Sequence, residues 1–277
     1  MSEQSASKST PSTGHPTFKR GSNVIAVASG KGGVGKTWFS ITLAHALTKM
    51  GKKVLLFDGD LGLANVDVQL GLMPKRDLND VIRGRLGLDK VIQTYEDGGF
   101  DIVAGRSGQA SLSALPSQRL GLLRDQLMEV ASSYDVVIAD LGAGVDRTVR
   151  MLSATASSTM LITTDEPTSL TDAYAFIKLG NAAGMSKNIN IVVNMVSSIT
   201  EGEKTYKTLL KACKNFLRLS PPLAGMVRVD PKVKETIRSQ TPILIRSPNA
   251  DAALDVEKIA KLVWHNVQNA QRRAAEA

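Results

Sequence analysis

The sequence predicts a doubly wound α/β fold, in which a mostly parallel sheet carries helices on both faces. From Asn23 onward, short apolar segments alternate with longer amphipathic ones, which is the pattern of βα units. The apolar segments show no polar face, as expected of strands that helices cover on both sides. The residues 1–21 are rich in Ser, Thr, Pro and Gly and are expected to form a disordered tail. With no internal repeat or linker within 23–270, the rest of the chain, 22–277, is expected to be one domain.

The expected strands are short runs rich in Val, Ile and Leu. In chain order they are Val24–Ala28, Lys53–Phe57, Phe100–Ala104, Asp135–Ala139, Thr159–Thr163, Ile189–Asn194 and Leu223–Val229.

The expected helices fill the intervals. The first, Thr37–Met50, places apolar side chains on one stripe, and Pro116–Ala131 begins with proline, which early helical positions favour. In Thr168–Ala183, Thr168 or Ser169 is expected to cap the N-terminus. Glu201–Leu217 and Asp251–Gln271 follow, and the last carries a core-facing stripe of Val256, Ile259, Val263 and Val267.

The composition excludes several classes of protein. Of 277 residues, 43% are hydrophobic but only 4% aromatic, so aliphatic side chains must fill the core. The lone cysteine, Cys213, is expected to pack in a helix, and it rules out an internal disulfide or a Cys-rich zinc module. The histidines are scattered, and His45 and His265 are expected on helix surfaces. No apolar run reaches the roughly 18 residues of a membrane span. The net charge of +8 is compatible with nucleic acid, an anionic membrane or phosphates as partner, and equally with a solvated basic surface that binds none of them.

The strongest motif is the octapeptide at 30–37, which matches G-x-x-x-x-G-K-T between an expected strand and an expected helix. Glycines let the backbone turn its N–H groups towards phosphate oxygens, and the helix N-terminus adds partial positive charge. Lys36 is expected to reach the β- and γ-phosphates, and the Thr37 hydroxyl to bind Mg²⁺. The predicted nucleotide-binding residues here are Gly32, Gly33, Val34, Gly35, Lys36, Thr37 and Trp38.

Carboxylates follow two of the expected strands. Asp58 and Asp60 come directly after Lys53–Phe57, and Asp140 directly after Asp135–Ala139. The carboxyl ends of parallel strands form the edge where α/β sheets bind ligands. Asp140 therefore fits a Walker B carboxylate that holds Mg²⁺ through water. A simple turn or cap is the alternative for each of these residues.

Lys31, early in the loop, gives the form K-G-G-V-G-K-T, which resembles the deviant Walker A motif of MinD/ParA-class P-loop ATPases. The resemblance implies that Lys31 contacts the phosphates of a partner chain in an ATP-sandwich homodimer. The stretch 58–67 resembles the switch I segment D-x-D-x-G-L-x-N-x-D of that class. By that match Asp60 orients the attacking water, Asp58 supports the Mg²⁺ shell, and Asn65 lies near the phosphates of the dimer.

The same resemblance extends to the base and to switch II. Asn194 closes an expected strand at the position where the class contacts adenine, and Arg228, Val229 and Asp230 occupy the loop that covers the base. The absence of an N-K-x-D motif favours adenine over guanine. The stretch 140–144 resembles the switch II segment D-x-P-A-G, with Gly142 in place of the proline. That glycine implies a more mobile switch.

Within this class, the stretches 62–72, 80–82, 166–174 and 192–196 resemble the FlhG/FleN family of flagellar-number regulators. The resemblance implies an Mg²⁺-dependent ATP hydrolase that dimerises with ATP and regulates flagellar number and placement. It implies FlhF, flagellar switch proteins or a flagellar transcription activator as partners. The expected location is cytoplasmic, with recruitment to the cell pole or the inner membrane face left open.

Two features depart from the family. The tail 1–20 contains nothing like the D-Q-A-x-x-L-R motif that stimulates FlhF, and 268–277 has no Leu, Phe or Trp to insert into lipid. The alternatives left open are a MinD-type division-site protein, which should bind acidic lipid, and a ParA-type partition protein, which should bind DNA. A reductase-like or metal-carrier member is disfavoured, because one cysteine cannot form a C-x-x-C cluster.

Overall fold

The computed structural model describes residues 21–105, 116–183 and 188–276, so 1–20 of the tail predicted at 1–21 lie outside them. Gly21, assigned to the tail from sequence, is the first residue of a strand. The described residues form an eight-stranded sheet in the order β3-β4-β2-β5-β1-β6-β7-β8. Every neighbouring pair is parallel except β3 with β4. The predicted fold class is confirmed, with one short antiparallel strand added at an edge. The strands are β1 (Gly21–Ser29), β2 (Val54–Gly59), β3 (Gln93–Tyr95), β4 (Phe100–Val103), β5 (Val136–Ala143), β6 (Ala156–Thr163), β7 (Ile189–Val196) and β8 (Leu223–Arg228).

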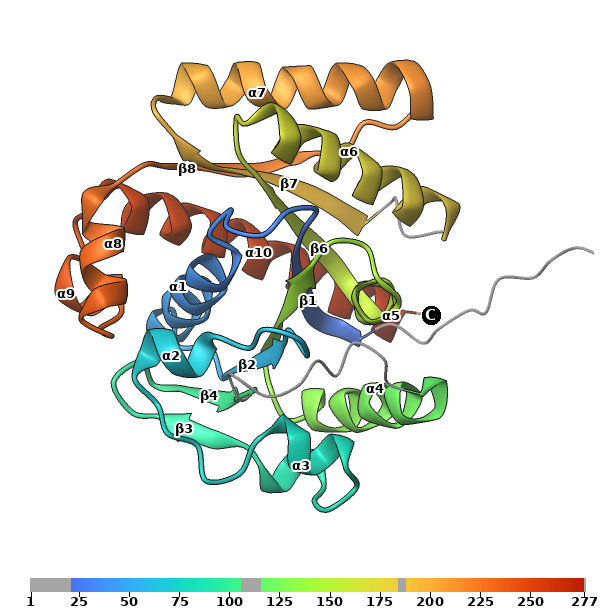
Figure 1. Ribbon diagram of the computed structural model, residues 1–277, viewed down its shortest axis with the longest axis vertical. Coiled ribbons are helices and arrows are strands. Elements are labelled where there is room, and N and C mark those ends of the chain that lie inside the picture. Colours follow the sequence, from blue (N-terminus) through green and yellow to red (C-terminus); the bar gives the residue numbers. More distant parts are fainter. Residues whose placement is uncertain (1–20, 106–115, 184–187, 277) are drawn as a thin grey trace, which may run out of the picture.

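Helices cover both faces of the sheet (Figure 1). They are α1 (Lys36–Lys49), α2 (Val66–Leu70), α3 (Leu78–Ile82), α4 (Ser117–Ala131), α5 (Arg147–Thr155), α6 (Pro167–Ala182), α7 (Ile199–Ala212), α8 (Pro231–Arg238), α9 (Ile243–Arg246) and α10 (Asp251–Ala275). A 3₁₀ turn spans Leu88–Lys90, and a π-helical turn, Cys213–Leu217, continues α7. Buried residues of α1, α2, α9 and α10 share one core cluster, and those of α3 to α7 share the other.

The central strand β1 shows why a strand that is covered on both faces is apolar along its length. Ile25 and Val27 belong to the core beneath α1 and α10, whereas Val24, Ala26 and Ala28 belong to the opposite core. Successive side chains of a strand point to opposite faces, and here both faces are covered. This accounts for strands that are apolar at every position.

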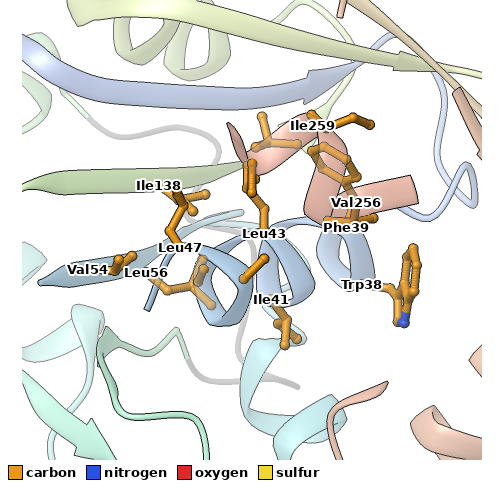
Figure 2. Packing of buried hydrophobic residues seen from close by; sticks show 14 of the residues in the cluster. Trp38, Phe39, Ile41, Leu43, Leu47, Val54, Leu56, Ile138, Val256 and Ile259 are labelled. Atoms are coloured by element: carbon orange, nitrogen blue, oxygen red, sulfur yellow. The ribbon is translucent and has the colours of Figure 1, made fainter. Parts of the chain in front are cut away.

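The first helix, α1, was predicted to bury one apolar stripe, but it is buried on every side. Residues 36–47 of α1 are all buried, because the sheet lies on one side and α10 and α9 pack on others. Figure 2 shows Phe39, Leu43 and Leu47 of α1 in the same cluster as Val256 and Ile259 of α10. The expectation that His45 lies on the helix surface is wrong. Its side chain is buried, and burial lowers its pKa.

The helix after β6 also begins differently from its prediction. Its N-cap is Glu166, and neither Thr168 nor Ser169 caps it. The Ser169 hydroxyl instead accepts a hydrogen bond from the backbone N–H of Thr164. The expectations for the last helix and for Cys213 are confirmed, since all four stripe residues and Cys213 are buried. In the described ranges, no helix is both long and apolar enough to span a bilayer.

Candidate functional site

The glycine-rich loop connects β1 to α1, as the sequence predicts. Gly33 and Gly35 have φ angles of 80° and 83°, a region that side chains with a Cβ atom occupy only at a cost. At Gly35 the space is closed as well, because a Cβ atom would lie 2.5 Å from Nδ2 of Asn194. Both positions therefore favour glycine, and a turn of this kind can direct successive N–H groups at a phosphate.

The sheet brings the predicted carboxylates to this loop. In the parallel pairing of β2 with β5, Asp58 lies opposite Asp140. Nζ of Lys36 is 3.1 Å from Oδ1 of Asp140, and the Thr37 hydroxyl donates to Oδ2 at 2.6 Å. All four side chains are buried. One ammonium group, one hydroxyl and two carboxylates thus meet at the start of α1, which is the arrangement that the motifs predict.

Asp58 has an unusual environment even within this group. It is fully buried, and its carboxylate accepts the backbone N–H groups of Val66 and Asp60. Burial, followed by the neighbouring charge of Asp140, raises the pKa of Asp58 to about 8, against partial compensation from those N–H groups and Lys36. Asp58 is therefore mostly protonated at neutral pH in this ligand-free arrangement. A further cation nearby would favour its ionised form at neutral pH.

We expect Asp58→Asn to stabilise the ligand-free protein. The pKa of Asp58 is about 8 in the folded chain, against an ordinary value of 3.8 that applies when the chain is unfolded. Between pH 3.8 and about 8 the unfolded chain therefore binds fewer protons than the folded one. Stability therefore falls as pH rises from about 4 to 8. Asparagine cannot ionise and therefore removes this loss. We expect the free energy of unfolding at pH 7 to rise on the order of 2 kcal/mol. This figure allows for the loss of one hydrogen bond, because the amide nitrogen cannot accept a backbone N–H.

Thermal unfolding of the ligand-free chains between pH 6 and 9 measures this effect. The variant should exceed the wild type in Tm by about 6 °C at pH 8, and the gap should narrow at pH 6. Asp97→Asn, in the exposed turn between β3 and β4, is the matched control and should match the wild type. A lower Tm for Asp58→Asn at pH 8 would contradict the pKa argument.

The second switch I carboxylate, Asp60, faces the cavity that this loop borders. Its Oδ1 accepts backbone N–H groups from Leu63 at 2.9 Å and Gly62 at 3.3 Å. A Cβ atom on Gly142 would lie 3.4 Å from the same oxygen, so Asp60 also adjoins the predicted switch II. Its own loop thus fixes the carboxylate between the two switches, without a bond to Lys36 or Thr37.

Lys31 contacts the same chain. Its Nζ is 2.5 Å from Oε2 of Glu166 and 2.9 Å from the Thr168 hydroxyl. The side chains of Lys31 and Glu166 are 37% and 60% exposed, so water weakens the pairing and its net contribution is about 0 to 1 kcal/mol. The contact is therefore easily exchanged for another anion. Glu166 and Thr168 were not predicted to approach the loop, and the sequence interval of 135 residues gives no local sign of it.

Most of the residues predicted to surround the base form hydrogen bonds or ion pairs within the protein. Asn194 is buried, and its amide donates to the Val34 carbonyl at 2.7 Å, which fastens the loop to the end of β7. The guanidinium of Arg228 points to α10, where it pairs with Asp255 at 2.7 Å and with Asp251 at 2.8 Å. Asp230 caps α8 by accepting the Lys232 N–H. Val229 remains exposed at the rim.

These segments enclose a cavity of about 480 Å³ that is mostly apolar. Volumes of this order suit small ligands and cofactors. Of the predicted residues, it is lined by Lys31, Gly32, Gly33, Gly35, Lys36, Thr37, Trp38, Asp60, Asn65, Asn194, Arg228, Val229 and Asp230. Asp58, Asp140 and Val34 do not line it: the two carboxylates are buried behind Lys36 and Thr37, and Val34 meets the site through its carbonyl. A separate hollow of about 500 Å³ between α3 and α4 contains none of these residues.

Sequence reasoning missed several residues at this cavity. Val233 and Ile237 come from α8, a helix that was not predicted because it is only eight residues long. Met195 follows Asn194 with a φ of 57° and is 43% exposed at the cavity. The one available signal was its place directly after the asparagine at which the strand was predicted to end. Ser40, which bonds to Asp140 but does not line the cavity, was also missed, although it follows Lys36 by one helical turn.

Comparison with known proteins agrees with this geometry. Residues 25–243 match the family described as the CobQ/CobB/MinD/ParA nucleotide binding domain. The chain is 40% identical over 241 residues to the antiactivator FleN of Pseudomonas aeruginosa, covering 87% of this chain and 85% of FleN. It is 32% identical over 252 residues to the flagellum site-determining protein YlxH of Helicobacter pylori, covering 88% and 83%.

Solved structures share the fold at lower identity. The septum site-determining protein MinD of Pyrococcus horikoshii, solved with Mg-ADP, superposes with a TM-score of 0.73 at 24% identity, covering 89% of this chain and 96% of MinD. The family match, the two relatives above 30% identity and the phosphate loop beside paired carboxylates agree. The chain belongs to the CobQ/CobB/MinD/ParA nucleotide-binding family and is a P-loop ATPase of its MinD/ParA class, similar to FleN and YlxH.

Proposed function

We propose that this ATPase is an Mg²⁺-dependent switch that dimerises with ATP and regulates the number and placement of flagella. The meeting of Lys36, Thr37, Asp58 and Asp140 at the glycine-rich loop carries the chemical part of the proposal. The similarity to FleN and YlxH supports the pathway. The whole of 22–277 acts as one ATPase domain in this proposal, and it works in the cytoplasm.

The donor groups at the loop fit magnesium. Mg²⁺ prefers oxygen ligands and in nucleotide sites uses one or two carboxylates together with phosphates and water. The Thr37 hydroxyl and the carboxylates of Asp58 and Asp140 supply oxygens of this kind. When bound, Mg²⁺ would neutralise phosphate charge. Its double charge would also favour the ionised form of Asp58.

Lys36 and Thr37 must exchange partners when nucleotide binds. Both side chains bond to Asp140 in the ligand-free arrangement. With ATP present, the Lys36 ammonium would hold the β- and γ-phosphates, and the loop's N–H groups would hold the remaining phosphate oxygens. Trp38, Asn194 and the segment 228–230 would enclose the nucleoside part of the cavity.

Hydrolysis then needs a positioned water and added positive charge. The Asp60 carboxylate, fixed between switch I and Gly142, would orient the water. Lys31 of a second copy would stabilise the charge that develops on the phosphates, as an arginine finger does. For that purpose Lys31 must leave Glu166 and Thr168, which the weakness of an exposed ion pair permits.

The rim of the cavity suits a second copy of the chain. Leu63, Met195 and Val229 are 77%, 43% and 62% exposed, and all three line the cavity mouth. Apolar side chains gathered around one opening are typical of an interaction surface. A face-to-face dimer would bury them and bring Lys31 of each chain to the other's nucleotide.

The proposed partners follow from the relatives. The name antiactivator, given to FleN, supports a flagellar transcription activator, and the name of YlxH supports flagellar proteins such as FlhF or switch components. Recruitment to the pole or the inner membrane face would occur through such partners.

Counting flagella in cells that lack the protein tests the pathway. We expect extra or displaced flagella, restored to normal by the wild-type chain but not by Lys36→Ala. Normal flagella with misplaced division septa would instead support the MinD-type alternative. DNA binding by the ATP-bound chain that falls steeply with salt would support the ParA-type alternative.

A further inference from the structure

Ser40 is a fully buried residue in the first turns of α1. It follows Lys36 by four residues, so the two side chains lie on the same face of the helix. The Ser40 hydroxyl is 3.0 Å from Oδ1 of Asp140 and 3.1 Å from the Lys36 carbonyl oxygen. No motif includes this position, yet it places a third donor on the Walker B carboxylate.

The two acceptors are not equivalent. A hydroxyl has one hydrogen to donate, and a serine inside a helix commonly donates it to the carbonyl four residues earlier. In a regular helix that carbonyl already accepts a backbone N–H. A buried carboxylate is the stronger acceptor, because bonds to an ionised group are about twice as strong as neutral ones. Asp140 is therefore the favoured partner of Ser40.

Three side chains donate to Asp140 in the ligand-free arrangement, namely Lys36, Thr37 and Ser40. The proposed function takes the first two away, since Lys36 moves to phosphate and Thr37 to Mg²⁺. Ser40 is 0% exposed and does not line the cavity, so it has no ligand to move to. It alone of these three can keep its bond when nucleotide binds.

We propose that Ser40 is a positioning residue that holds one oxygen of Asp140 in the loaded state and thereby aims the other at the Mg²⁺ shell. The proposal rests on the proposed function. Once Lys36 and Thr37 have moved to the ligand, Ser40 is the one of these three donors that still fixes the rotation of the Asp140 carboxylate. Without Ser40, the carboxylate loses its orientation at the moment when the cation needs it.

The test compares Ser40→Ala with Ser153→Ala. Ser153 is a matched control, because it is also a buried helical serine and its hydroxyl has no hydrogen-bond partner among the described residues. The affinity of each chain for ADP is measured by calorimetry with excess Mg²⁺ and with EDTA. The Mg²⁺ concentration giving half-maximal ATPase rate is measured in parallel.

For Ser40→Ala we expect an Mg²⁺ requirement about tenfold higher, as is typical when a side chain that orients a metal ligand is removed. Its ADP affinity in EDTA should stay within about twofold of the wild type, and its rate at saturating Mg²⁺ should largely recover. Ser153→Ala should match the wild type throughout. Should Ser40→Ala fail to fold, Ser40→Cys keeps the shape with a weaker donor and should show a smaller shift of the same kind.

Two results would overturn the role of Ser40. One is an unchanged Mg²⁺ requirement, which would mean that the hydroxyl serves only the Lys36 carbonyl. The other is equal weakening of ADP binding with and without Mg²⁺, which would mean a general packing defect. A wild-type chain that binds ADP equally with Mg²⁺ and EDTA would contradict the proposed function itself, so the two failures are distinguishable.

Discussion

Replacing Asp60 by alanine should leave a chain that binds ATP and dimerises but hydrolyses ATP at least about 100-fold more slowly. The carboxylate lines the cavity without touching Lys36 or Thr37, so phosphate binding should survive its loss. Positioned acids and bases contribute typically 10²- to 10⁴-fold to a rate. The variant should therefore accumulate as the ATP-bound dimer.

Phosphate release under saturating ATP and the mass of the chain in solution measure the two halves of this prediction. Asp97→Ala, at an exposed turn remote from the cavity, is the control and should hydrolyse ATP normally. Hydrolysis by Asp60→Ala within threefold of the wild type would remove Asp60 from the mechanism. Loss of ATP binding would show instead that its bonds to the Gly62 and Leu63 N–H groups hold the whole site together.

Replacing Lys31 by alanine should produce a folded chain that binds ATP and stays monomeric. Lys36, Thr37 and Asp140 are untouched by this change, and the exposed pair with Glu166 contributes about 0 to 1 kcal/mol, so Tm should shift by only about 1 to 3 °C. The ATPase rate should fall on the order of 10³-fold, because a cation supplied in trans contributes about that much to phosphoryl transfer.

The control for Lys31→Ala is Lys261→Ala, an exposed lysine of α10 away from the cavity. It should dimerise and hydrolyse ATP like the wild type. If Lys31→Ala dimerised with ATP and hydrolysed it at the wild-type rate, the lysine would have no role across the interface, and its contacts with Glu166 and Thr168 would be its function.

Much of the fold and the centre of the site could be predicted because the responsible signals are local. A strand covered on both faces must be apolar at every position, so the parallel strands were found within a few residues of their ends. The glycine-rich loop requires glycine where φ is positive, and it stands next to the lysine and threonine that it presents. Asp58 and Asp140 lie opposite each other towards the carboxyl ends of adjacent strands, so their meeting follows from the sheet.

The errors came from contacts that are distant in sequence. The amphipathic pattern of α1 predicts a surface position for His45, but its ring lies against Phe100 of β4 and near Glu257 of α10. Thr168 looked like a helix cap, and instead it accepts a hydrogen bond from Lys31. Arg228 lines the cavity, and nothing near it in the sequence signals that Asp255 of α10 pairs with its guanidinium. Short helices such as α2 and α8 hold too few turns to show a period.

The most direct test of the central claim is the mass of the wild-type chain in solution with Mg-ADP and with a non-hydrolysable ATP analogue. The account predicts a monomer with ADP and a doubled mass with the analogue, and the doubling should be absent in Lys31→Ala. A monomer in both nucleotides, from a chain that nevertheless binds them and hydrolyses ATP, would contradict the dimer switch.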